Sequence, residues 1–308
     1  MSTGRNPVST IFVGAVLLLL IARACQSAPE PGVVEGEGQA IEPAQVEGAG
    51  QERAPSEAQA PVAEGLRWQV VEEGLEVAAW EPAVGVKAHV VRVSLERWSL
   101  RSLVAERLDE GFEEGQEGPA WTARRFVEET GARAAINGGF FDPKGMAMGL
   151  RVSGGRQLVA YRKVDWGVYF IREGRPKLVH ARDWKADPRV DFAIECGPRL
   201  VHAGAPFKLK PNLHRRTAIG HGADGRVVLL VTLDPVDLND LAAGMARPTS
   251  EGGLGLVEAL NLDGGPSTQL EIDAEGASRW SLLGLTGVAD AVAVFPVKEA
   301  PDKRRRSP

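Results

Sequence analysis

The stretch Asn261-Leu262-Asp263-Gly264-Gly265-Pro266-Ser267-Thr268 follows a short apolar run at residues 255–260. The apolar run predicts a buried strand, which would end on two polar side chains, Asn261 and Asp263. Two glycines then allow a sharp turn and a close approach of the backbone to other atoms. Polar groups at the end of a buried strand are typical of ligand sites in α/β sheets. The alternative interpretation is an ordinary Asp-Gly turn.

Two further stretches have a related design. In Ala134-Ala135-Ile136-Asn137-Gly138-Gly139-Phe140-Phe141-Asp142-Pro143, an apolar strand again ends in Asn, two glycines and an acid. The stretch Arg215-Arg216-Thr217-Ala218-Ile219-Gly220 adds two cations and leads to an apolar strand at residues 226–232. Three polar strand ends, one of them with arginines, predict a converging site for an anionic ligand that is rich in hydroxyl groups.

The remaining pattern predicts the fold class, which is α+β (mixed α/β): a strand-rich single domain with a mixed β-sheet and few helices. We expect this domain to cover residues 65–298. A helix is expected at residues 121–130, where Gly131 would end it, and another at 238–245, with Asp237 as its N-cap. Strands are expected at residues 68–71, 75–80, 89–95, 100–104, 149–152, 164–171, 177–180, 192–198 and 289–297.

The composition excludes several classes of protein. The 308 residues carry a formal net charge of -5, but eight Glu and one Arg fall within residues 26–64, so the domain itself is close to neutral. Broad nucleic-acid binding requires a basic face, and no nucleic acid is expected as a partner. Two cysteines, Cys25 and Cys196, are too few for a disulfide framework or a cysteine-based zinc site.

Residues 1–25 have the features of an export signal. Arg5 precedes an apolar run at residues 11–22, which is long enough for a signal peptide and short for a membrane span. A small residue before Cys25 is typical of a lipoprotein signal, so we expect lipid attachment at Cys25 and a membrane as a partner through this N-terminal anchor. Ordinary secretion and an uncleaved anchor are the alternatives. The expected location is the cell envelope.

The segments on either side of the domain have compositions that disfavour folding. Residues 26–64 are rich in Glu, Ala, Gly, Pro and Gln and have no aromatic residue. Such a segment cannot bury enough apolar surface to offset its ordering entropy, so we expect a disordered acidic tether. Residues 299–308 are expected to form a disordered basic tail.

Four motifs together resemble the phosphodiester glycosidase family. They are Asn137-Gly138-Gly139-Phe140-Phe141, Gly197-Pro198-Arg199-Leu200-Val201, Arg216-Thr217-Ala218-Ile219-Gly220 and Asn261-Leu262-Asp263-Gly264-Gly265, in the order that the family has them. The resemblance covers roughly residues 85–296 and departs from the family at Pro266, where relatives usually have a third glycine. It implies hydrolysis of a sugar-1-phosphodiester, and bacterial members are often associated with exopolysaccharide.

Hydrolysis at a sugar C1 usually takes two carboxylates. Asp263, inside the best motif, is the first candidate, and Glu195 is the second, although acids at strand ends also serve only to meet solvent. Asp142 is a third candidate, but it precedes a proline and could simply shape a turn. A departing phosphomonoester has a second pKa near ~6, so one carboxylate together with neutralisation of the phosphate charge could suffice.

Arg216 is the candidate for that neutralisation, because its planar guanidinium matches phosphate oxygens; the alternative is a surface arginine pair with Arg215. Asn137 is the fourth candidate catalytic residue. The main-chain N–H groups of the two adjacent glycines could hold sugar hydroxyls or phosphate oxygens, and the two hydroxyls that follow Pro266 could do likewise or cap the next element. The candidate substrate-binding residues are Gly138, Gly139, Phe140, Asp142, Thr217, Gly264, Gly265, Ser267 and Thr268.

Other chemistries fit the sequence less well. It contains no Gly-x-Ser-x-Gly elbow and no Walker-type phosphate loop. We expect no cofactor and no metal, with a divalent cation held by Asp142 and Asp263 as the alternative. The sequence therefore predicts a hydrolase of a glycosyl phosphodiester or related envelope glycan, tethered in the bacterial cell envelope. The alternative is an envelope lipoprotein that binds a glycan or phosphate without turnover.

The predicted anchor gives the first test. Replacing Cys25 by alanine removes the only sulfur that could accept lipid in this segment, so the variant is expected to leave the membrane fraction. Fractionation of cells that express the C25A variant checks this. A variant that stays in the membrane with its first 24 residues uncleaved would contradict lipid attachment.

Overall fold

The computed structural model describes residues 66–275, 277 and 280–297. The expected export signal at residues 1–25, the tether at 26–64 and the tail at 299–308 lie outside the described residues. Among the helices that are described, none has the length and apolar character needed to cross a lipid bilayer.

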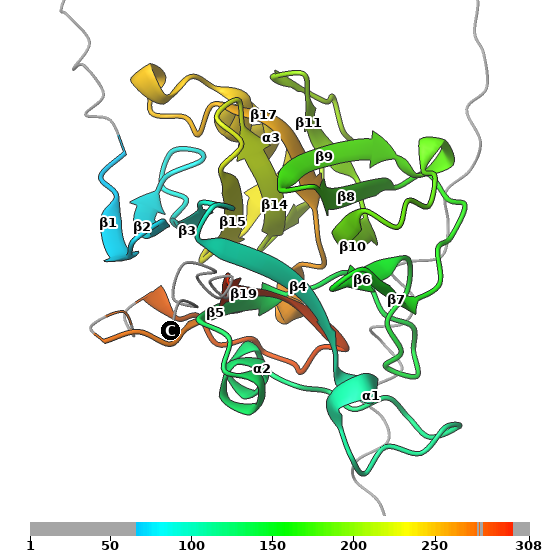
Figure 1. Cartoon of the computed structure of the whole chain (residues 1–308). Helices are drawn as coiled ribbons and strands as arrows, with labels where there is room; N and C mark the ends of the chain where they lie inside the picture. The colour runs from blue at the N-terminus through cyan, green and yellow to red at the C-terminus, as the bar shows by residue number, and fades with distance from the viewer. Residues whose placement is uncertain (1–65, 276, 278–279, 298–308) are drawn as a thin grey trace, which may run out of the picture. The chain divides into compact units, whose positions relative to one another are not determined.

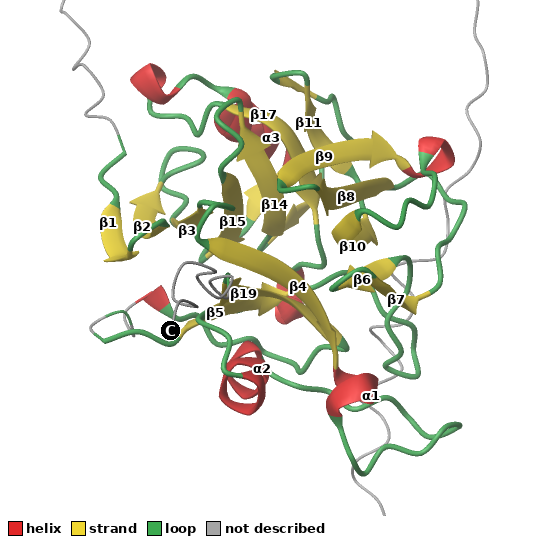
Figure 2. Ribbon diagram, viewed as in Figure 1, coloured by secondary structure: helices red, strands yellow, loops and turns green. Residues whose placement is uncertain are grey.

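The largest sheet has eight strands in the order β1-β2-β3-β15-β14-β17-β11-β12 (Figures 1 and 2). It brings the strand that precedes Asp263 next to the strand that begins at Thr217. The bounds are β1 (Gln69–Glu72), β2 (Leu75–Trp80), β3 (Ala88–Val93), β11 (Arg199–His202), β12 (Ala205–Pro206), β14 (Thr217–Gly222), β15 (Val227–Thr232) and β17 (Leu256–Asn261).

Two smaller sheets and a short strand pair complete the strands. One sheet has the order β18-β5-β19-β4, the other has the order β7-β6-β10-β8-β9, and β13 pairs with β16. The bounds are β4 (Trp98–Val104), β5 (Ala134–Asn137), β6 (Arg151–Ser153), β7 (Arg156–Val159), β8 (Gly167–Arg172), β9 (Arg175–His180), β10 (Val190–Cys196), β13 (Leu213–His214), β16 (Val236–Asp237), β18 (Leu270–Ile272) and β19 (Asp290–Pro296).

The strand-rich character and the small number of helices agree with the expected fold, but the expected mixed sheet is wrong. Every strand pair in the described part of the chain is antiparallel. Parallel neighbours need long crossover connections, which are usually helices, whereas antiparallel strands can be joined by tight hairpins. Hairpins join β2 to β3, β8 to β9 and β14 to β15, and these short connections make the neighbouring strands antiparallel.

The main core lies between the eight-stranded sheet and the two smaller sheets. Strand β15 shows how the sequence produces this arrangement, because Val227, Leu229 and Val231 enter the main core while Val228 and Leu230 enter a second core on the other face. A strand that is buried on both faces reads as a continuous apolar run, which is the pattern of residues 227–231.

Two helices cover outer faces of the sheets. Helix α3 (Leu238–Ala246) packs in the second core of the eight-stranded sheet, and helix α2 (Ala123–Thr130) packs against the four-stranded sheet. The predicted caps are confirmed: Asp237 accepts from the N–H of Asn239, and Gly131 ends α2 with φ of 68°. The short elements are α1 (Ala105–Leu108) and the 3-10 turns η1 (Ala181–Asp183), η2 (Thr249–Glu251) and η3 (Gly265–Ser267).

Candidate active site

The ends of β5, β14 and β17 meet at the side chain of Asn137. Its Nδ2 donates to the main-chain oxygen of Asp263 at 2.7 Å, and its Oδ1 accepts from the hydroxyl of Thr217 at 2.7 Å. The same oxygen accepts from the N–H of Gln269 at 3.1 Å. Asn137 is fully buried, so its amide joins three chain segments. Asn137 therefore positions the site, and the catalytic role expected of it from the sequence stays a prediction.

Asp263 lies at this junction with a partly buried carboxyl group. Its Oδ1 accepts from the N–H of Gly264 at 3.0 Å, and the hydroxyl of Ser267 donates to the same carboxyl group. Burial raises the pKa of Asp263 to about 6, the two hydrogen bonds oppose the rise, and the negative charge of Asp290 adds to it. A carboxyl group with such a pKa exchanges its proton close to neutral pH, which suits an acid–base group.

Gly138 and Gly139 lie against a fully buried ion pair that the sequence did not reveal. A Cβ atom at Gly138 would overlap the carboxylate of Asp290, and one at Gly139 would overlap the guanidinium of Arg151. Arg151 Nε donates to Asp290 Oδ2, and both side chains have 0% exposure. The two glycines are therefore required by the ion pair behind them, since any side chain would displace it.

Glu195 does not supply a second carboxylate to the site. Its Oε2 accepts from the N–H groups of Leu150 at 2.7 Å and Arg162 at 3.0 Å. The residue is fully buried, and burial raises the pKa of its carboxyl group. The next residue, Cys196, faces the main core instead, because successive side chains of a strand point to opposite faces. The expected catalytic role of Glu195 is thus not supported by its position.

Arg216 also departs from the expectation. Its guanidinium donates to the main-chain oxygens of Asn212 and Val236, the second at 3.4 Å, and only 6% of the residue is exposed. The neighbouring Thr217 points to Asn137 instead. Arg216 therefore secures the chain before β14, and a role as phosphate ligand has no geometric support.

Arg215 lies on the opposite face of the extended chain from Arg216. The main-chain oxygens of Arg215 and Thr217 accept from Gly265 at 2.8 Å and Leu262 at 2.9 Å, so both face the same neighbouring segment. In such an extended chain, residues two apart share a face, which places Arg215 on the face that carries Thr217. Among the described residues, the Arg215 guanidinium has no hydrogen-bond or ion-pair partner.

The other sequence candidates divide between the site and local turns. Asp142 Oδ1 accepts from the N–H groups of Lys144 and Met146 at 2.9 and 3.0 Å, so its carboxylate shapes its own turn. Phe140 is partly buried and donates its N–H to the sulfur of Cys196, which lies beside Asp263. Thr268 is buried, and its hydroxyl has no partner in the part of the chain that the structure describes.

Arg151 and Asp290 are the residues that sequence reasoning missed. Both stand in segments that were expected to be strands, at residues 149–152 and 289–297. Charged side chains are almost never fully buried without a partner, so one Arg and one Asp in apolar strands could have been read as a pair. The sequence offers no signal that these two strands meet at Gly138.

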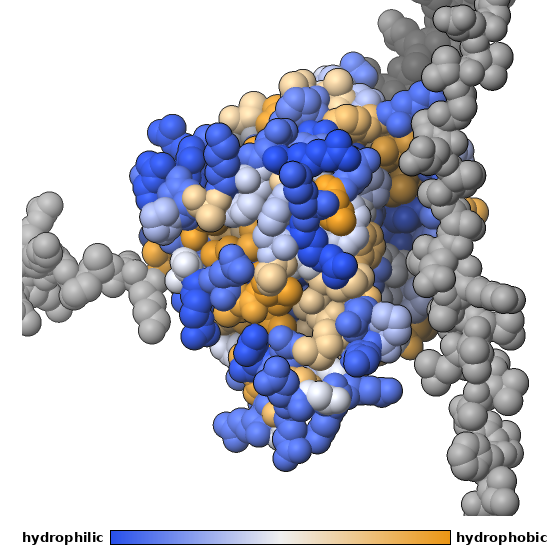
Figure 3. All heavy atoms as spheres, turned by 90° about the vertical axis from the view of Figure 1, so that its right-hand side faces the viewer, coloured by the Kyte–Doolittle hydropathy of each residue, from blue (hydrophilic) through white to orange (hydrophobic). Residues whose placement is uncertain are grey.

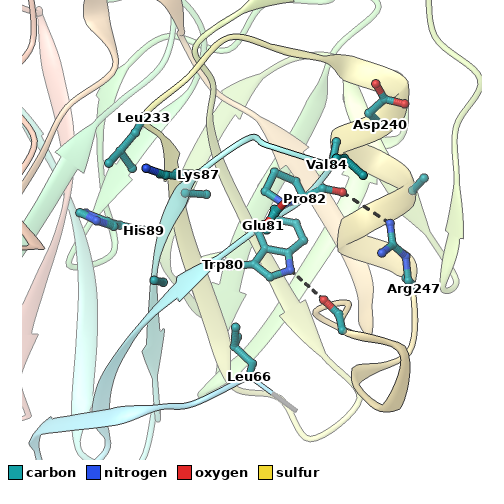
Figure 4. A pocket seen from close by; sticks show the side chains of 15 residues that line it. Leu66, Trp80, Glu81, Pro82, Val84, Lys87, His89, Leu233, Asp240 and Arg247 are labelled. Atoms are coloured by element: carbon teal, nitrogen blue, oxygen red, sulfur yellow. Dashed lines mark hydrogen bonds between the residues drawn. The ribbon is translucent and has the colours of Figure 1, made fainter. Parts of the chain in front are cut away.

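Two hollows on the surface lie away from this site. A cavity of about 880 Å³ lies between α3 and the β2–β3 connection and is lined by Trp80, Pro82, Lys87, Asp240 and Arg247, among others (Figure 4). It shares no residue with the cluster around Asp263. A basic hollow of about 360 Å³ lies at the β8–β9 turn. The side of the domain that faces the viewer in Figure 3 shows hydrophilic and hydrophobic residues intermixed. Within the described residues, no group of three or more His, Cys, Asp or Glu side chains could hold a metal ion.

The fold and the cluster define a strand-rich protein with a polar site at converging strand ends, centred on a carboxyl group that titrates near neutral pH. A family model described as phosphodiester glycosidase matches residues 130–295. This match covers more than half of the chain, and the protein belongs to that family.

Individual relatives are distant. The chain is 23% identical over 188 residues to the uncharacterized protein YigE of Escherichia coli K12, which covers 54% of this chain and 68% of YigE. The catalytic domain of zebrafish N-acetylglucosamine-1-phosphodiester alpha-N-acetylglucosaminidase, auto-inhibited by its pro-peptide, has a similar fold, with a TM-score of 0.53 and 16% identity over 77% of this chain and 85% of that chain. A hypothetical protein from Synechocystis gives a TM-score of 0.51 and 14% identity over 78% of this chain and 65% of that chain.

The raised pKa of Asp263 predicts a stability effect. The folded state keeps the proton up to about pH 6, whereas the unfolded state loses it near 3.8, so stability falls as the pH rises through this interval. Asp263→Asn has no charge to bury and is expected to be more stable than the wild type above pH 6, by up to about 3 kcal/mol. The difference is expected to close below pH 4.

Urea unfolding at pH 4 and pH 7.5 measures this difference. Asp142→Asn is the matched control, because it removes a carboxylate that is bound only within its own turn. A gain for Asp263→Asn that is equal at both pH values would show that the carboxyl group of Asp263 is not held in its protonated form.

Proposed function

We propose that this protein is a hydrolase that cleaves the bond between a sugar C1 and the phosphate of a glycosyl phosphodiester, with Asp263 as its acid–base residue. The observation that carries the proposal is the carboxyl group of Asp263, which is partly accessible, placed where three strands end, and has a pKa raised to about 6. Membership of the phosphodiester glycosidase family supports the reaction class.

The raised pKa of Asp263 suits the leaving group of this reaction. When the C1–oxygen bond breaks, the bonding electrons stay with the phosphate oxygen, and the proton of Asp263 goes to that leaving phosphomonoester. Water adds to C1 and releases one proton, which restores Asp263. The second pKa of a phosphomonoester is near ~6, so donor and acceptor have similar proton affinity, the condition under which general acid catalysis is effective.

The phosphate group requires a cation, and in our proposal Arg215 replaces Arg216 in this role. Arg215 lies on the face that carries Thr217, and the loop of Gly264 and Gly265 packs against its main-chain oxygen. A guanidinium that is not engaged by the protein can bind two phosphate oxygens at once. The guanidinium of Arg216 is already engaged with main-chain carbonyls.

The substrate class and location are drawn from the family and the sequence. The name of the zebrafish enzyme describes a sugar-1-phosphodiester as substrate. We propose that the substrate of this protein is of that type or is a related cell-envelope glycan. Export and lipid attachment at Cys25 would hold it in the envelope, near exopolysaccharide. A lipoprotein that binds such a glycan without turnover is the competing function.

Kinetics of Asp263→Asn test the proposal. The variant keeps the shape of the side chain but cannot donate the proton, so kcat on a sugar-1-phosphodiester is expected to fall by ~10²-fold or more. In the wild type, activity is expected to fall about tenfold for each pH unit above 6, because only protonated Asp263 is active. Binding of the diester by the wild type with no turnover would identify the competing function instead.

The two adjacent arginines offer a matched comparison. Arg215→Gln is expected to raise KM for the diester about tenfold or more, because the loss of one charge-assisted hydrogen bond weakens binding by about that factor. The thermal stability of this variant is expected to be unchanged. Arg216→Gln is expected to lower Tm, because two main-chain carbonyls lose their donor. If the KM effect belongs to Arg216 and Arg215→Gln behaves as the wild type, the assignment of the phosphate ligand is wrong.

A further inference from the structure

The buried pair of Arg151 and Asp290 is more than a packing contact. Its two side chains have 0% exposure. Besides Nε, the Nη2 atom of Arg151 donates to Asp290 Oδ1 at 3.4 Å, and Nη1 donates to the main-chain oxygens of Gly149, Leu150 and Glu195 at 3.3, 3.1 and 3.0 Å. Each nitrogen of the guanidinium thus has an acceptor within the protein, and the buried group presents no face to a substrate. Apolar residues of similar volume often replace such a pair without loss of stability, so a purely structural role does not account for the charges.

A short chain of hydrogen bonds connects this pair to the acid–base residue. The carboxylate of Asp290 accepts from the N–H of Gly139 at 3.4 Å, and its main-chain oxygen accepts from the N–H of Gly138 at 2.8 Å. The main-chain oxygen of Gly138 in turn accepts from the N–H of Asp263 at 3.2 Å. The position of the Asp263 backbone therefore depends on the place of Asp290.

The charges around Asp263 come from different elements, and in the proposed function they include the guanidinium of Arg215, which precedes β14. Asp290 on β19 is the acidic neighbour, and Arg151 on β6 is bound to it. Cys196 on β10 is a thiol whose pKa burial raises to about 12, so it is uncharged, and Ser267 contributes a hydroxyl. Two neighbouring carboxyl groups in a buried region do not ionise equally, and a cation bound to one of them decides which carries the charge.

We propose that Arg151 and Asp290 are positioning residues. Arg151 holds the carboxyl group of Asp290 in place, and Asp290 fixes Gly138 and Gly139 beside Asp263 and brings its negative charge close to it. This inference rests on the proposed acid–base role of Asp263. It assigns the second carboxylate of the site to Asp290 on β19, in place of Glu195, and gives that carboxylate no contact with the substrate.

The direct test is a titration of the carboxyl groups of the full chain by carbon NMR, with Asp263→Asn used to assign the Asp263 signal. The midpoint of the Asp263 signal in the wild type is the reference with which the variants at Asp290 and Arg151 are compared.

Variants extend the test. Asp290→Asn removes the negative charge, so Asp263 is expected to titrate about one pH unit lower. Asp290→Asn leaves the buried charge of Arg151 without an opposite charge beside it. The double variant Arg151→Met with Asp290→Asn therefore removes both charges, and it is expected to show a shift in the same direction. Arg151→Lys keeps the positive charge and is expected to leave the titration of Asp263 near its wild-type pH.

The control is Glu76→Gln, which removes one carboxylate of the Glu76–Arg92 pair, a 2.7 Å ion pair on β2 and β3 that is only partly exposed. It is expected to leave the titration of Asp263 unchanged. In the enzyme assay, the pH above which activity falls is expected to move by the same amount as the NMR midpoint. An unchanged Asp263 midpoint in the folded Asp290 variants would refute the positioning role alone, whereas full activity of Asp263→Asn would refute the proposed function.

Discussion

The side-chain amide of Asn137 is the interaction on which the site depends. β5 belongs to the four-stranded sheet, whereas β14 and β17 belong to the eight-stranded sheet, so one buried amide joins two layers at their strand ends. A buried amide that lost one of these partners would leave an unsatisfied polar group, which costs about 1–3 kcal/mol. The distance between the sheets at this edge, and with it the place of Asp263, is fixed by that requirement.

The electrostatics of the site follow from this geometry. Joining the strand ends buries Asp263 enough to raise its pKa, and it brings the negative charge of Asp290 close without exposing Asp290 to solvent. The two carboxyl groups therefore lie in different surroundings, one bound to a guanidinium and the other to a hydroxyl and an N–H group. Burial is the main reason why the pKa of Asp263 is raised, and the charge of Asp290 adds to it.

Sequence reasoning was strong where the pattern is local. The apolar run of β15, the cap of α3 at Asp237 and the polar end of β17 can each be predicted from a few adjacent residues, because burial and capping depend on short-range chemistry. It was weak where a side chain's partner lies far along the chain. Glu195 and Asp290 are both acids in apolar strands, and only the pairing of the strands decides which of them lies beside Asp263. Arg215 and Arg216 are adjacent in an extended chain, so their side chains point to opposite faces. The sequence does not show which of the two faces the site.

β19 lies between β5 and β4 in the four-stranded sheet, although it is the last strand of the described residues. Until it is inserted, β4 and β5 have no partner on the sides that face each other, and the site lacks Asp290. Pairings between segments this far apart in sequence form slowly, because the entropic cost of closing the long loop precedes the stabilising contacts. A chain that emerges from its N-terminus during synthesis therefore completes its site only when β19, the last of these strands to emerge, has paired with β4 and β5.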